Sequence, residues 1–150
     1  MPQAARHLLC TLGVMNSRLV LSFFLLSAAS ALAQSSAPGE KQCFRKPSHV
    51  EARACLEEQA KQSAMSVKQA ESNVRSSLAK WDQEPSYKSR STSELEAASL
   101  QFVRFRDSQC AFHASMAAGG NGAGDRRLLC EIELNNRHIA DLQRIHRFLQ

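Results

Sequence analysis

The chain has 150 residues, of which 43% are hydrophobic and 22% charged, with a formal net charge of +5. This length suits a single domain. Basic and acidic residues are interleaved, and the basic ones do not cluster with aromatics as in nucleic-acid binders. Removing Arg6 and Arg18, which belong to the signal described next, from the 19 basic residues leaves 17 against 14 acidic ones. That excess of three indicates no particular partner and argues against nucleic acid.

The N-terminal segment has the pattern of a secretory signal. Arg18 precedes an apolar run at residues 19–26, and the small residues that follow end in Ala31-Leu32-Ala33, an A-x-A cleavage pattern. Met15 is an alternative start that would give a more ordinary signal length. The apolar run is too short to span a bilayer, and no later segment is long enough. We therefore expect a mature chain without a membrane span.

The domain organisation follows from that signal. We expect residues 1–33 to be the signal peptide, residues 34–47 a leader segment, and residues 48–150 a single helical domain. Export places the mature protein in the periplasm or outside the cell, where the environment is oxidising. Paired thiols in such a compartment form disulfides more readily than metal sites or catalytic nucleophiles.

The mature chain has four cysteines, which we expect to form two bonds, Cys43–Cys55 and Cys110–Cys130. In an antiparallel helical pair joined by a turn near Asn121, position 110 lies opposite about position 131, close to Cys130. Cys43–Cys55 would hold the leader on the first turns of the first helix. Four cysteines allow three connectivities, and the two crossed ones would require the leader to reach the helical hairpin.

The first predicted helix begins with a capping box. Ser48 is the expected N-cap, with Glu51 three residues later. No glycine or proline interrupts the chain from there to about Trp81. Apolar or small residues recur at helical spacing, which predicts the inner face of this helix: Val50, Ala54, Ala60, Ala64, Val67, Val74, Leu78 and Trp81.

Residues 82–90, with Pro85 at their centre, are expected to break the helical pattern as a loop. Two overlapping capping boxes, ending at Glu94 and Glu96, predict the start of a second helix that runs to about Ala118. Its apolar residues lie close to heptad spacing: Leu95, Ala98, Phe102, Phe105, Phe112 and Met116.

The glycine-rich segment Gly119–Gly124 predicts a turn, because glycine is unfavourable inside helices and favoured just past their ends. Asp125 is the expected cap of a third helix. Its predicted apolar face consists of Leu128, Ile132, Ile139, Leu142 and Leu149. No strand-like alternation competes. We therefore predict an all-α fold: a small bundle of about three helices with an antiparallel C-terminal hairpin, stapled by two disulfides.

The sequence contains little that supports catalysis or metal binding. Cys110 and His113 have a C-x-x-H spacing, but a zinc site needs four converging ligands with reduced thiolates. The sequence has no G-x-S-x-G, phosphate-binding or H-E-x-x-H motif. We expect no enzyme activity, no cofactor and no metal. Arg106 is expected to be solvated or paired with an acid on a neighbouring helix, so that for Arg106 and Asp107 a structural salt bridge is favoured over a binding role.

One block resembles a known family. Phe102, Phe105, Arg106, Asp107 and Cys110 form F-x-x-F-R-D-x-x-C, followed by a Gly-Gly turn and a cysteine that opens a helix. This arrangement resembles the LprI-type lysozyme inhibitor family, in which a tryptophan usually stands at the position of Phe102. The resemblance covers about residues 43–142, and it implies a helical fold and a role in inhibiting lysozyme.

If the chain inhibits a muramidase, a protruding loop would fill the cleft that holds the enzyme's two catalytic carboxylates. The candidate loops are residues 82–90 and Gly119–Gly124. Candidate partner-binding residues are Tyr87, Lys88, Arg90, Arg106 and Asp107. The alternative is a non-inhibitory envelope module that binds another protein through its helix faces.

Overall fold

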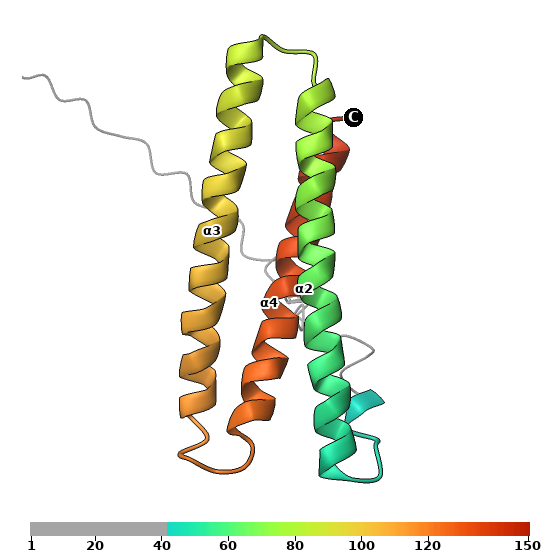
Figure 1. Ribbon diagram of the computed structural model, residues 1–150, viewed down its shortest axis with the longest axis vertical. Helices are drawn as coiled ribbons and strands as arrows, with labels where there is room; N and C mark the ends of the chain where they lie inside the picture. Colours follow the sequence, from blue (N-terminus) through green and yellow to red (C-terminus); the bar gives the residue numbers. More distant parts are fainter. Residues whose placement is uncertain (1–41) are drawn as a thin grey trace, which may run out of the picture. The chain divides into compact units, whose positions relative to one another are not determined.

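The computed structural model describes residues 42–150, which belong to one compact unit. Three long helices are present: α2 (His49–Lys80), α3 (Pro85–Ser115) and α4 (Ala123–Phe148). They lie side by side, with α3 antiparallel to both other helices (Figure 1). The described residues contain no strand, so the predicted all-α fold with a C-terminal helical hairpin is confirmed. The predicted signal peptide and most of the leader lie outside the described residues.

The predicted start of α2 is confirmed, but the inner face of its first turns is not. Ser48 is the N-cap, and its Oγ accepts a hydrogen bond from the backbone N–H of Glu51. Val50 is 77% exposed, whereas Leu56, which was not predicted to face the core, is fully buried. Val50 lies two positions before the buried Ala52 and so about 200° around the helix. Ala54 is exposed as well.

The predicted loop at residues 82–90 is wrong. α3 begins at Pro85, so only Trp81–Glu84 connect the two helices, and the proposed capping boxes lie inside α3. Proline fits the first turn of a helix, because its φ is already helical and its missing N–H has no intrahelical partner there. Pro85 therefore starts the helix instead of interrupting a loop. Tyr87 and Arg90 lie on the first two turns of α3.

The predicted turn between the last two helices is present, shifted toward the N-terminus. α3 ends at Ser115, and the backbone then takes left-handed φ angles of 48° at Ala118 and 78° at Gly119. Gly119 adopts this conformation without the Cβ penalty that other residues incur. α4 has Gly122 as its N-cap, so Asp125 is in the first helical turn and is not the cap.

The apolar core lies mainly between α2 and α4. One cluster, near the disulfides, contains Leu56, Ala60 and Ile132, and the other contains Val74 and Leu142. The predicted face of α4 is therefore correct. α3 contributes little to this core, since Cys110 is its only buried residue. The exposed fractions of its apolar residues are 52% for Phe105, 58% for Phe112 and 50% for Met116, and Ala98 is also exposed.

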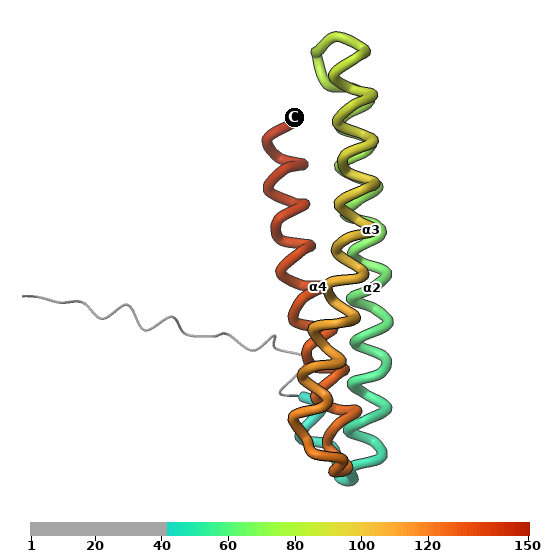
Figure 2. The backbone as a smooth tube through the Cα atoms, turned by 90° about the vertical axis from the view of Figure 1, so that its left-hand side faces the viewer, coloured from blue at the N-terminus to red at the C-terminus, as the bar shows by residue number. Residues whose placement is uncertain are grey.

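Both predicted disulfides are present, Cys43–Cys55 and Cys110–Cys130. The first holds the segment before α2 on the first turns of that helix, and the second joins the end of α3 to the start of α4. Both lie at the same end of the bundle. Toward the other end, α4 diverges from α3 (Figure 2). None of the described helices is long and apolar enough to cross a membrane.

Candidate partner-binding site

The five residues predicted to bind a partner form two separate groups. Tyr87, Lys88 and Arg90 lie at the start of α3, and Arg106 and Asp107 lie near its end. Eighteen residues separate Lys88 from Arg106, which corresponds to roughly 27 Å along a helix. The structure therefore does not bring the five residues into one site.

The first group is located where a partner could reach it. The connection Trp81–Glu84 and the first turn of α3 extend beyond the C-terminal end of α4 (Figures 1 and 2). Tyr87 is 58% exposed, Arg90 is exposed and Lys88 is partly buried. Neither disulfide lies at this end, and α3 has no buried residue before Cys110.

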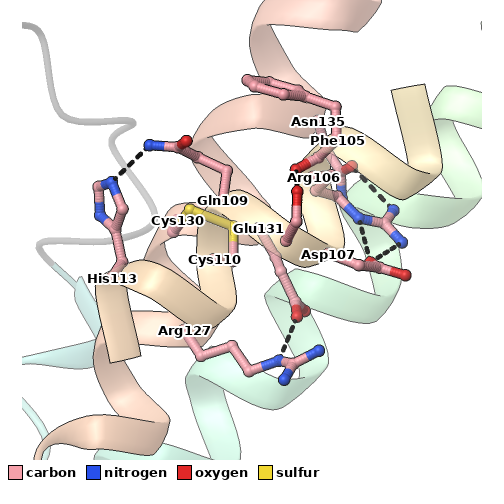
Figure 3. The surroundings of a disulfide bond; sticks show 11 residues. Phe105, Arg106, Asp107, Gln109, Cys110, His113, Arg127, Cys130, Glu131 and Asn135 are labelled. Carbon is pink, nitrogen blue, oxygen red and sulfur yellow. Dashed lines mark hydrogen bonds and ion pairs between the residues drawn. A yellow bond between two sulfur atoms is a disulfide. The ribbon is translucent and has the colours of Figure 1, made fainter. Parts of the chain in front are cut away.

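The second group has a structural role. The Arg106 side chain is only 18% exposed. Its Nη1 donates to Oδ1 of Asn135 on α4 at 3.2 Å, and its Nη2 donates to Oδ1 of Asp107 at 3.0 Å (Figure 3). Arg106 does form a salt bridge, but its partner is Asp107, the next residue on the same helix, and not the predicted acid on a neighbouring helix. These contacts join Arg106 to α4 and to its neighbour on α3.

Asn135 extends these contacts to the third helix. Its Nδ2 donates to Oγ of Ser63 on α2 at 2.9 Å, and that hydroxyl donates to the carbonyl oxygen of Ala60. Asn135 is 1% exposed, so its amide is desolvated and needs these partners. One polar chain therefore connects α2, α4 and α3 beside the Cys110–Cys130 bond. Asn135 fills a position in the apolar spacing of α4 after Ile132, and this signal would have identified it from the sequence.

His138 forms a second contact among the three helices. Its ring stacks on that of Phe102 of α3 at a centroid distance of 3.9 Å, and its Nε2 lies 3.9 Å from Oε1 of Glu71 of α2. Nε2 is buried without a hydrogen-bond partner. Desolvation lowers the pKa of His138 below 6.5, although Glu71 and Asp141 act in the opposite direction. The neutral form of the ring is therefore favoured at this position, where it packs between α2 and α3.

The turn between α3 and α4 is thin and exposed. Asn121 has the only side chain larger than a methyl group between Met116 and Ala123. Within the described residues, the backbone N–H groups of Gly119, Asn121 and Gly122 donate no hydrogen bond. The turn therefore presents three free backbone donors and one side-chain amide to the solvent.

This turn is held from both sides. The Cys110–Cys130 bond closes its two helices, with the turn between them. Asp125, in the first turn of α4, accepts from Nη1 of Arg53 at 3.5 Å and lies 2.8 Å from Nε2 of His49. Gly124 allows Arg53 to approach, because a Cβ at that position would collide with the guanidinium group. The base of the turn is thus attached to the start of α2.

The described residues contain no group of three or more His, Cys, Asp or Glu side chains that could hold a metal ion. The C-x-x-H spacing of Cys110 and His113 is not a site, because the cysteine sulfur is bonded to Cys130.

The sequence profile of the family described as lysozyme inhibitor LprI matches residues 40–142. The chain belongs to the lysozyme inhibitor LprI family. The match includes both disulfides, the Arg106–Asp107 pair, the thin turn and most of α4, and it confirms the resemblance seen in the sequence. LprI is a family of inhibitors and not of enzymes. No curated protein and no solved structure gives a significant match to the chain.

Proposed function

We propose that this protein acts outside the cytoplasm as an inhibitor of a lysozyme-type muramidase, and that it blocks the enzyme by inserting a loop into its cleft. Its place in the LprI family is the observation that supports this proposal. The two disulfides agree with an oxidising compartment, and the proposed N-terminal signal would provide export. The proposed partner is therefore a protein, and the proposed location is the periplasm or the cell exterior.

We propose the turn Ala117–Gly122 as the inserted element. A muramidase cleft accommodates a polysaccharide between two carboxyl groups, so an inserted segment must be slender and must offer hydrogen-bond donors. The turn is slender, because Asn121 has its only side chain larger than a methyl group. Its donors are the free N–H groups of Gly119, Asn121 and Gly122. The Cys110–Cys130 bond and the Arg53–Asp125 ion pair hold the turn in place before binding. Such preorganisation lowers the entropic cost of association.

The opposite end of the bundle is the competing candidate. Tyr87, Lys88 and Arg90 offer an aromatic ring and two cations, which suit a carboxylate-lined cleft. They lie on a helical hairpin, however, and two packed helices are about 18–20 Å wide with their side chains. A thin turn fits more easily into a cleft shaped for one sugar chain. The expected contribution of these three residues to inhibition is therefore small.

A turbidity assay with bacterial cell walls and a hen-type lysozyme tests the proposal. The oxidised protein should slow lysis at micromolar concentration. Gly122→Phe adds a bulky side chain where no atom lies within 4 Å of the new Cβ, so it should lower the melting temperature only slightly, through the less favourable N-cap of α4. It should raise the concentration needed for half-inhibition at least tenfold.

The matched control is the triple variant Tyr87→Ala, Lys88→Ala, Arg90→Ala at the other end, which should inhibit like the wild type. If this triple variant loses inhibition and Gly122→Phe retains it, the tip of the α2–α3 hairpin is the inhibitory element instead. If the wild type does not slow lysis, the inhibitory function is rejected, and the alternative of a non-inhibitory envelope module is favoured.

A further inference from the structure

α3 has a heptad row, and within residues 42–150 only one half of it packs against other helices. The row consists of Leu95, Ala98, Phe102, Phe105, Gln109, Phe112 and Met116. Leu95 packs against the core cluster around Leu142, and Phe102 stacks on His138. Ala98, Phe105 and Phe112, which alternate with the inward positions, are exposed. A seam that repeats every seven residues is typical of helices that pack against another helix along their length.

The exposed half forms an outer row, which we define as Tyr87, Ala98, Phe105, Phe112 and Met116, with the polar Ser91 and Glu94 between its first two members. Tyr87 precedes Phe105 by 18 residues, or five helical turns, so the two lie on the same side of α3. Near its middle the row meets α4, because Ala98 lines an apolar pocket of about 380 Å³ together with Ile145 and Phe148. Phe148 is 82% exposed.

The area of this surface matches what a stable dimer needs. The exposed fractions of Tyr87, Phe105, Phe112 and Phe148 are 58%, 52%, 58% and 82%. With roughly 200 Å² for each aromatic side chain, these four expose about 500 Å². One side of a standard interface buries about 800 Å², of which about 65% is apolar in homodimers. The exposed aromatic area of about 500 Å² is therefore nearly equal to the apolar area, roughly 520 Å², of one side of such an interface.

The charges that border the outer row favour a second copy of the same chain. Along its outward flank lie Arg90, Gln101, Arg104, Ser108 and Ala111, of which Arg90 and Arg104 are charged, and Glu94 lies on the row's side one turn before Ala98. Neither Glu94 nor Arg104 forms an ion pair within the described residues. In an antiparallel pair of α3 helices with its two-fold axis at residue 100, position 104 lies opposite position 96 of the other copy. Each Arg104 is then within one turn of the other copy's Glu94.

We propose that two copies of this chain associate through the outer row of α3, with the two α3 helices antiparallel. Such an isologous interface repeats every contact twice and covers the exposed aromatic rings of both copies. The proposal is independent of muramidase inhibition, since it concerns a face along α3 and not the turn Ala117–Gly122.

Sedimentation velocity of the full chain with its disulfides formed tests the proposal, over about 1–200 µM protein. We expect a reversible monomer–dimer equilibrium in this range. The double variant Phe105→Gln, Phe112→Gln should weaken self-association at least tenfold, with unchanged helicity by circular dichroism. The matched control is Leu100→Gln, which alters a 63%-exposed residue on another side of α3 and should associate like the wild type.

A charge exchange tests the antiparallel arrangement. Glu94→Arg and Arg104→Glu should each weaken the dimer, and the two changes together should restore it. A wild-type chain that stays monomeric at 200 µM overturns the proposal, as does equal weakening by Leu100→Gln. Failure of the combined exchange to restore association overturns the antiparallel pairing. If the outer row is covered by the first 41 residues of the same chain, the protein stays monomeric and the proposal fails.

Discussion

α2 and α3 are nearly equal in length, with 32 and 31 residues, yet they are held in the molecule by different interactions. α2 buries residues along its whole length, from Ala52 to Leu78, and packs against α4 through two apolar clusters. α3 buries only Cys110. Its other attachments are the Arg106–Asn135 hydrogen bond, the stack of Phe102 on His138, the Arg75–Glu96 ion pair and partly buried side chains such as Leu95.

This difference shows that a helix need not contribute much core to have a defined position. A disulfide and a buried polar chain hold α3 at one end, while several of its apolar residues are exposed among the described residues. The same aromatic residues that would normally stabilise a three-helix core are exposed on α3. We infer that α2 and α4 provide stability and that α3 and its following turn provide surface.

Leucine truncations on the two helices give the largest expected contrast. Leu56→Ala on α2 removes a fully buried side chain and should lower the free energy of unfolding by about 3–4 kcal/mol. Leu95→Ala on α3 removes a partly buried one and should cost about 1 kcal/mol, because less apolar area returns to water. Urea unfolding followed by circular dichroism measures both. Equal losses would show that α3 belongs to the core as fully as α2.

Removal of each disulfide should produce similar losses of stability but different local effects. In the chain-entropy model, separations of 12 and 20 residues each correspond to about 3 kcal/mol. Cys110→Ala with Cys130→Ala should also speed amide hydrogen exchange throughout α3, since few apolar contacts remain to hold it. Cys43→Ala with Cys55→Ala should leave exchange in α3 nearly unchanged. Slow exchange in α3 after loss of the 110–130 bond would contradict the proposed dependence on that bond.

The smallest expected effect concerns pH at the contact between α3 and α4. Because burial lowers the pKa of His138 below 6.5 in the folded state, its neutral ring contributes full stability above that pH. As pH falls below 6.5, the unfolded chain takes up the proton first, so stability decreases until the folded-state pKa is passed. His138→Leu should remove this part of the pH dependence. Unfolding curves at several pH values between 7 and 5 would show it, and parallel curves for the two proteins would exclude it.

The parts of the fold predicted from the sequence are those with local signals. Ser48 and Glu51 determine the start of α2 through a short-range cap, and the cysteine spacing is consistent with the hairpin register. Pro85 alone does not distinguish a loop from a helix start, because proline is typical both of loops and of the first helical turn. Only the neighbouring residues in space decide between them. The outcome was a connection of four residues instead of nine.

The surface of α3 was not predictable from its own sequence. Its heptad row indicates that Phe105 and Phe112 contact a helix, but not that the inward positions would be filled by Leu95, Phe102 and Gln109. Which half of the row turns inward depends on the Cys110–Cys130 bond and on Asn135, a polar residue in the apolar spacing of α4. Tertiary contacts of this kind have no signature within a single helix.

The two disulfides have a topological consequence for proteolysis. Cys43–Cys55 lies wholly before the connection Trp81–Glu84, and Cys110–Cys130 lies wholly after it. A protease that cuts this exposed connection once would leave two fragments with no covalent link, even in the fully oxidised protein. Only the noncovalent contacts of α2 with α3 and α4 would keep them together, so a nicked sample should separate in denaturant without any reducing agent.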